Sequence, residues 1–176
     1  MTLPYFDLSG RIAIVSGGAS GIGLAISEAY AEAGATVVIC SRRLEICVDM
    51  AASLTARTGA EVVGMRCDVT ASDSIDKMLK ELVAKYGGID VLVNCAGVAG
   101  SEKPALKMEI DDWNSVIDIN LTGAFKLTKA VGAGMVKRGK GGRVVNVASI
   151  GGAIGLPNMS AYCASKGGLV QMTKVL

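Results

Sequence analysis

Five short apolar runs, rich in β-branched residues, recur along the chain, and a longer segment of helical character separates each from the next. Strands that are apolar at nearly every position have both faces covered, as in a parallel sheet flanked by helices. Right-handed crossover helices then connect the parallel strands. The chain therefore predicts an α/β fold, a doubly wound parallel sheet in a single domain over residues 1–176. The predicted strands are residues 11–16, 36–40, 61–66, 90–94 and 143–149.

The segments between these strands carry helix signals. The second predicted helix ends at Gly59, a residue type suited to the left-handed C-cap. Ser72 or Asp73 offers an N-cap for the third. Residues 111–139 divide into two helical pieces, and a last helix begins near Ser160.

Composition excludes several classes of function. The 18 basic and 16 acidic residues leave a net charge of +2, which gives no electrostatic case for binding nucleic acid. No apolar run approaches the roughly 20 residues of a membrane helix. The first ten residues, "MTLPYFDLSG", lack the basic and apolar regions of a signal peptide. With no histidine and five cysteines outside any CxxC motif, we expect a cytoplasmic protein with buried, reduced thiols and no metal site.

The stretch "VSGGASGIGLA" places a glycine cluster between the first predicted strand and the first predicted helix. Glycine allows positive φ and close approach of the backbone to a pyrophosphate, whose oxygens would face the N–H groups of the helix. The alternative is a glycine-rich turn that only allows tight strand–helix packing. The pattern indicates a phosphate loop for a dinucleotide, whose candidate residues are Gly17, Ser20, Gly21, Ile22 and Gly23.

The end of the second predicted strand, "TVVICSRR", favours NADP as the cofactor. A carboxylate for ribose hydroxyls is expected near Ser41 in NAD-binding folds, and none is there. Arg42 follows directly, with Arg43 beside it, and a guanidinium suits a 2′-phosphate. NAD is the second choice, in which case the two arginines are ordinary surface charges.

Five short motifs stand in order along the chain: "SGGASGIG" (16–23), "NCAG" (94–97), "IN" ending at Asn120, "VNVAS" ending at Ser149, and "YCASK" (162–166). In order and spacing they resemble the short-chain dehydrogenase/reductase family over essentially the whole chain. Ser16 stands where threonine is usual, and Cys95 replaces the second asparagine of the usual NNAG. The resemblance implies a Rossmann-like sheet of strand order 3-2-1-4-5. The last two family strands and the loop that closes over the substrate would be missing from this sequence.

The chemistry can be argued from the residues themselves. Reducing a ketone needs a hydride, which the cofactor supplies, and a proton, which a tyrosine can supply. A phenol has a pKa near 10, and a neighbouring cation lowers it. Tyr162 and Lys166 are four apart and share one helix face, although such a pair also occurs by chance on helix surfaces. Ser149 can donate to the substrate oxygen, or it can serve only as a cap.

The resemblance assigns further roles. It implies that Asn120 holds a water that links Lys166 to solvent, and that Asp68 contacts the adenine. In isolation, Asn120 could be a helix cap and Asp68 a turn residue. The other residues that the resemblance places along the cofactor are Val69, Asn94, Ala96 and Gly97, together with Tyr162 and Lys166.

We therefore expect an NADP-dependent oxidoreductase that interconverts a secondary alcohol and a ketone, with Tyr162 as the acid and base. The alternative is a truncated form that binds nucleotide or joins an oligomer without turnover. A nucleotide-sensing regulatory domain is a third, weaker possibility. The chain resembles 3-oxoacyl-thioester reductases and sugar-acid or polyol dehydrogenases equally. The family also implies a homodimer or homotetramer, formed through helices near residues 120–138 and 160–176.

Overall fold

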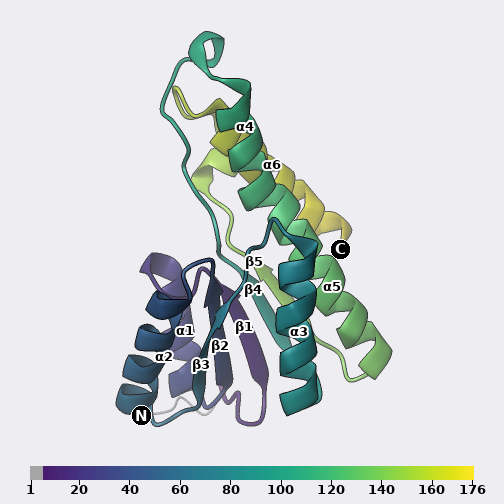
Figure 1. The fold of residues 1–176 in the computed structure, drawn as a ribbon. Helices are drawn as coiled ribbons and strands as arrows, with labels where there is room; N and C mark the ends of the chain where they lie inside the picture. Colours follow the sequence, from purple (N-terminus) through teal and green to yellow (C-terminus); the bar gives the residue numbers. More distant parts are fainter. Residues whose placement is uncertain (1–5) are drawn as a thin grey trace.

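Residues 6–176 are described by a computed structural model, and they form a parallel sheet of order β3-β2-β1-β4-β5 (Figure 1). The first five residues, part of the segment in which we predicted no signal peptide, lie outside the described residues. All five predicted strands and the implied strand order are confirmed. The strands are β1 (Ile12–Ser16), β2 (Thr36–Ser41), β3 (Val62–Arg66), β4 (Val91–Asn94) and β5 (Arg143–Asn146).

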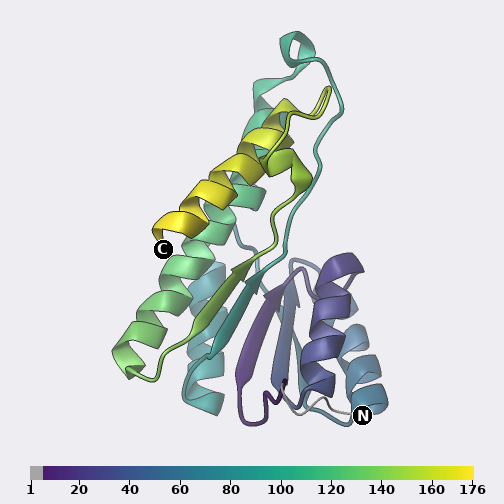
Figure 2. The ribbon, with the colours of Figure 1, turned by 180° about the vertical axis from the view of Figure 1, so that it is seen from behind.

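Helices cover both faces of the sheet. Two of them, α1 and α2, lie on one face, whereas α3 and α5 lie on the other (Figures 1 and 2). The central strands β1 and β2 are buried along nearly their whole length, which explains why their sequences are apolar on both faces. The bounds are α1 (Gly21–Glu32), α2 (Leu44–Thr58), α3 (Ser72–Tyr86) and α5 (Gly123–Arg138).

Two local predictions are wrong. The fifth strand ends at Asn146 and not at residue 149, because its partner β4 ends at Asn94, whose carbonyl accepts the last ladder bond from Val147 at 2.9 Å. The N-cap of α3 is Ala71, so neither Ser72 nor Asp73 caps it. By contrast, Gly59 does end α2 in the left-handed conformation, at φ 73°.

Residues 110–138 form one continuous helical rod. A π-helical turn, η2 (Asp118–Thr122), joins α4 (Ile110–Ile117) to α5. The two predicted helical pieces are therefore present but joined without a break, and Asn120 lies inside the rod and is not a cap. Together with α6 (Ser160–Val175), α4 extends beyond the carboxyl ends of the strands (Figures 1 and 2). Two 3₁₀ turns lie at the same end, η1 (Ala105–Lys107) and η3 (Ile150–Gly152).

All five cysteines are free. Cys40, Cys47 and Cys67 are buried as predicted, whereas Cys95 and Cys163 are only half-buried because they follow β4 and begin α6 at the open edge of the sheet. None of the helices in the described part of the chain combines the length and apolar character needed to cross a bilayer.

Candidate active site

The connection between β1 and α1 depends on glycines. Gly17 and Gly21 have φ of 70° and 52°. A Cβ on Gly17 would lie 3.0 Å from the backbone of Ala96, and one on Gly23 would overlap the carbonyl oxygen of Gly17. The helix starts after Ser20, whose side chain makes no capping hydrogen bond, so the first N–H groups of α1 remain available to an anion.

Ser16 ties this loop to the neighbouring strand. Its hydroxyl donates to the carbonyl of Val93 at 3.3 Å and accepts from the N–H groups of Cys95 and Ala96 at 3.1 and 3.2 Å. The strand order reverses between β1 and β4, which is where ligands bind in open α/β sheets. Ser16 therefore holds together the two sides of the expected ligand crevice.

A pocket of about 360 Å³ opens at the carboxyl ends of the strands. The predicted cofactor residues that line it are Gly17, Ser20, Ser41, Arg42, Asp68, Val69, Ala96 and Gly97. Arg43, which the sequence analysis named beside Arg42, also lines it, as do residues that the sequence analysis missed: Ala19, Cys40, Cys67, Val98 and Ile119. The predicted cofactor residues Gly21, Ile22, Gly23, Asn94, Tyr162 and Lys166 do not line it, and neither do the predicted catalytic residues Asn120 and Ser149. A larger, more open hollow of about 730 Å³ at the opposite edge contains no predicted site residue, so the smaller pocket is the better candidate.

Opposite charges face each other in this pocket. Asp68 Oδ1 accepts from the N–H and the hydroxyl of Thr70, at 2.9 and 2.7 Å. These bonds lower the pKa of Asp68 below its usual value, and the nearby guanidinium of Arg42 adds to the effect. Neither Arg42 nor Arg43 forms an ion pair with any residue between 6 and 176. Both guanidinium groups are therefore available to an anionic ligand.

Asn94 has a different environment from the other predicted cofactor residues. It is buried, and its Nδ2 donates to Thr128 Oγ1 and to Asn146 Oδ1, both at 2.8 Å. Its Oδ1 has no hydrogen-bond partner among the described residues. The Asn94 side chain thus links β4 to β5 and α5 inside the protein, away from the pocket wall.

Tyr162 and Lys166 lie on one face of α6, as predicted. The Lys166 Nζ is 6.0 Å from the centroid of the Tyr162 ring and donates to the carbonyl of Val147 at 2.7 Å. Lys166 is only 6% exposed, and this burial lowers its pKa below the usual value. The half-buried thiol of Cys95 lies close enough to oppose that shift. An ammonium group is therefore held at the base of the site, next to a phenol.

Asn120 connects this pair to the pocket. It is 1% exposed, and its Oδ1 accepts from Val98 N at 2.8 Å, while its Nδ2 donates to Val98 O and Ser165 Oγ at 2.9 and 3.1 Å. A Cβ on Gly97 would lie 3.2 Å from Asn120 Oδ1 and 3.8 Å from Lys166 Nζ. Both amide hydrogens are thus engaged, and a relay water could bind only to an oxygen of Asn120.

Ser149 acts as a cap and also keeps a free donor. Its Oγ accepts from Gly151 N at 3.1 Å at the start of η3, while its hydroxyl hydrogen remains available to a ligand. A Cβ on Gly151 would lie 3.3 Å from Tyr162 Cε1, so this turn packs against the tyrosine ring. The structure therefore brings Ser149, Tyr162, Lys166 and Asn120 to the same edge of the sheet as the pocket.

Comparison with known proteins gives concordant matches. A family described as short chain dehydrogenase matches residues 11–176. D-threitol dehydrogenase of Mycolicibacterium smegmatis is 43% identical over 171 residues, which cover 97% of this chain and 65% of that protein. A 3-oxoacyl-[acyl-carrier-protein] reductase of Synechocystis is 36% identical, over 96% of this chain and 68% of that protein.

A solved structure has a similar fold. That of NAD⁺-bound xylitol dehydrogenase matches with a TM-score of 0.91 and 35% identity, over 95% of this chain and 64% of that chain. The present chain thus spans about two thirds of the length of the relatives that it matches.

Proposed function

The chain belongs to the short chain dehydrogenase family, and on this premise we propose that it is an NADP-dependent oxidoreductase that interconverts a secondary alcohol and a ketone. One observation carries the proposal. The buried ammonium of Lys166 lies beside the Tyr162 ring and adjoins Gly97, which lines the nucleotide pocket. A proton donor, a cation and a nucleotide pocket at one edge of a sheet are the components that carbonyl reduction needs.

The residues around the pocket fit a nicotinamide dinucleotide. The close approach of Gly17 to Ala96 and the uncapped start of α1 suit a pyrophosphate. The Asp68 carboxylate would accept from the adenine amino group, and Lys166 would donate to ribose hydroxyls. When bound, this cofactor supplies the hydride or takes it up.

The proton would move through Tyr162. In reduction, its hydroxyl hydrogen passes to the carbonyl oxygen of the substrate, and in oxidation the phenolate takes the proton from the alcohol. Lys166 stabilises the phenolate by its charge. The free hydroxyl hydrogen of Ser149 would bind the same substrate oxygen and orient it. Asn120 keeps the Val98 segment and α6 in position around this pair.

Replacing Arg42 by alanine tests the preference for NADP. Because Arg42 lines the pocket without an ion-pair partner among residues 6–176, it would bind the 2′-phosphate directly. We expect Arg42→Ala to weaken NADPH binding by about 10- to 100-fold, the loss of a charge-assisted contact, and to leave NADH almost unaffected. Fluorescence titration of both nucleotides measures the two dissociation constants.

Arg57→Ala is the matched control. Arg57 lies on α2 and pairs with Glu28 at 2.8 Å, away from the pocket, so its loss should change neither affinity. Equal losses of NADPH and NADH affinity in Arg42→Ala would contradict the NADP assignment and favour NAD. NADPH and NADH must both be tested, because the related xylitol dehydrogenase was solved with NAD⁺ bound.

For the substrate, we propose small polyols and the matching ketoses, because two of the relatives described above are named for D-threitol and xylitol. Turnover of these compounds should be compared with that of a 3-oxoacyl thioester. Binding of NADPH without turnover of any carbonyl compound would favour the alternative, a nucleotide-binding or oligomer-partner form. We further propose that the protein is cytoplasmic, which the five free cysteines support, and that it forms the homodimer or homotetramer that the family resemblance implies.

A further inference from the structure

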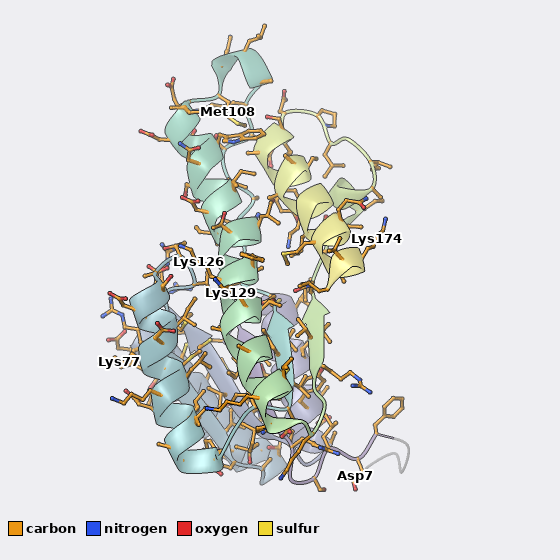
Figure 3. The ribbon with its side chains drawn as sticks, turned by 90° about the vertical axis from the view of Figure 1, so that its right-hand side faces the viewer. Asp7, Lys77, Met108, Lys126, Lys129 and Lys174 are labelled. Carbon is orange, nitrogen blue, oxygen red and sulfur yellow. The ribbon has the colours of Figure 1, made fainter. Side chains whose placement is uncertain are left out.

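Lys126 joins α5 to the loop that carries Asp68. It lies one turn after the π-helical turn that contains Asn120, and its Nζ donates to the backbone carbonyl of Thr70 at 2.7 Å. Figure 3 shows Lys126 on α5, level with the N-terminal end of α3. The Lys126 ammonium group thus holds the backbone at Thr70, directly after the pocket residues Asp68 and Val69.

A second contact fixes the same loop on the same helix. Gly123, the first residue of α5, packs so closely on Val69 that an added Cβ would lie 2.7 Å from Val69 Cγ2. Val69 itself lines the nucleotide pocket and is buried. The loop therefore rests on α5 at Val69 and is hydrogen-bonded to it at Thr70.

Thr70 passes this restraint on to Asp68. Both of its donors, N–H and hydroxyl, bind Asp68 Oδ1, while the N–H of Asp68 donates to Ser74 Oγ at 2.9 Å. Asp68 Oδ2 has no hydrogen-bond partner among the described residues, so it is the oxygen available to a ligand. A hydrogen-bonded chain thus runs from Lys126 through Thr70 to the carboxylate in the pocket.

We infer that Lys126 is a positioning residue for the adenine half of the nucleotide. It touches no nucleotide atom in this role and acts by holding Thr70, and with it Asp68, in the geometry that accepts the adenine. The inference rests on the proposed nucleotide-binding function. Lys126 also couples the adenine site to the rod that carries Asn120, because both belong to the same continuous helical segment.

The experiment compares Lys126→Met with Lys129→Met in the purified protein. Methionine keeps the length of the side chain and removes the donor. Lys129 is an exposed residue on the same helix, labelled in Figure 3, and serves as the control. The probes are NADPH, adenosine 2′,5′-bisphosphate, which contains only the adenine half, and reduced nicotinamide mononucleotide, which contains only the other half.

For Lys126→Met we expect about tenfold weaker binding of NADPH and of the bisphosphate, the loss of one charge-assisted hydrogen bond, with unchanged binding of the mononucleotide. Lys129→Met should bind all three like the unaltered protein. Unchanged binding of the bisphosphate by Lys126→Met, or an equal loss in Lys129→Met, overturns the inference.

Two further variants separate positioning from a loss of folding. Lys126→Arg keeps a donor and should restore most of the affinity, and failure to do so contradicts the role of the hydrogen bond. Thr70→Val removes one bond to Asp68, so the effects of Thr70→Val and Lys126→Met should be less than additive. If the unaltered protein binds neither NADPH nor the bisphosphate, the proposed function fails. If it binds both and Lys126→Met does too, the inference alone fails.

Discussion

Tyr162→Phe should lower kcat by about 10²- to 10⁴-fold, the usual contribution of a positioned general acid and base. The ring that packs on Gly151 and lies near Lys166 is retained in this variant, and only the hydroxyl is lost. NADPH affinity should therefore stay close to that of the unaltered protein. The measurements are steady-state turnover with the best polyol or ketose and fluorescence titration with NADPH.

Tyr86→Phe is the matched control for this prediction. The hydroxyl of Tyr86 donates to Glu61 at 2.8 Å on an exposed surface, and this residue lines none of the nucleotide pocket. Its removal should leave kcat unchanged. Turnover by Tyr162→Phe at the rate of Tyr86→Phe would show that another group transfers the proton.

Gly23→Ala should abolish nucleotide binding. The added methyl group would overlap the carbonyl oxygen of Gly17 and lie 2.9 Å from its carbonyl carbon, and backbone atoms cannot move aside as a flexible side chain can. The loop must therefore open, and we expect the free energy of unfolding to fall by about 1–3 kcal/mol, as for other overpacked sites. Isothermal titration with NADPH and urea denaturation measure the two effects.

For Gly134→Ala we expect no loss of stability, in contrast to Gly23→Ala. Gly134 lies within α5, and a Cβ there would meet no atom within 4 Å beyond its chain neighbours and the nearby backbone of its own helix. Alanine is favoured over glycine inside a helix, by up to about 1 kcal/mol, so this variant should be as stable as the unaltered protein or more so. Full NADPH binding by Gly23→Ala would refute the close packing described for the phosphate loop.

Much of the fold follows from local patterns in the sequence. Runs such as residues 36–40 are apolar on both faces because helices cover both sides of β2, so hydrophobicity alone indicates a parallel sheet. Gly59 ends α2 because glycine adopts positive φ without a steric cost. Neither inference needs knowledge of distant parts of the chain.

Features that depend on distant partners could not be predicted. The end of β5 depends on the end of its partner strand β4. The last residue pair of the two strands, Asn94 and Asn146, is 52 residues apart in the sequence. Nothing near Asn94 in the sequence indicates that its amide lies between two strands and a helix. The contact from Lys126 to Thr70 was also missed, because its acceptor is a backbone carbonyl, which every residue possesses.

The deep burial of the central strands has a consequence for local stability. Helices enclose β1 and β2, and every residue from Ala13 to Ser16 is buried. Backbone amides open least readily where many buried contacts hold them, so we expect the amides of β1 to exchange with solvent only when the whole sheet unfolds. The phosphate loop follows β1 directly. The glycine loop should therefore stay anchored to the sheet during local fluctuations elsewhere in the protein.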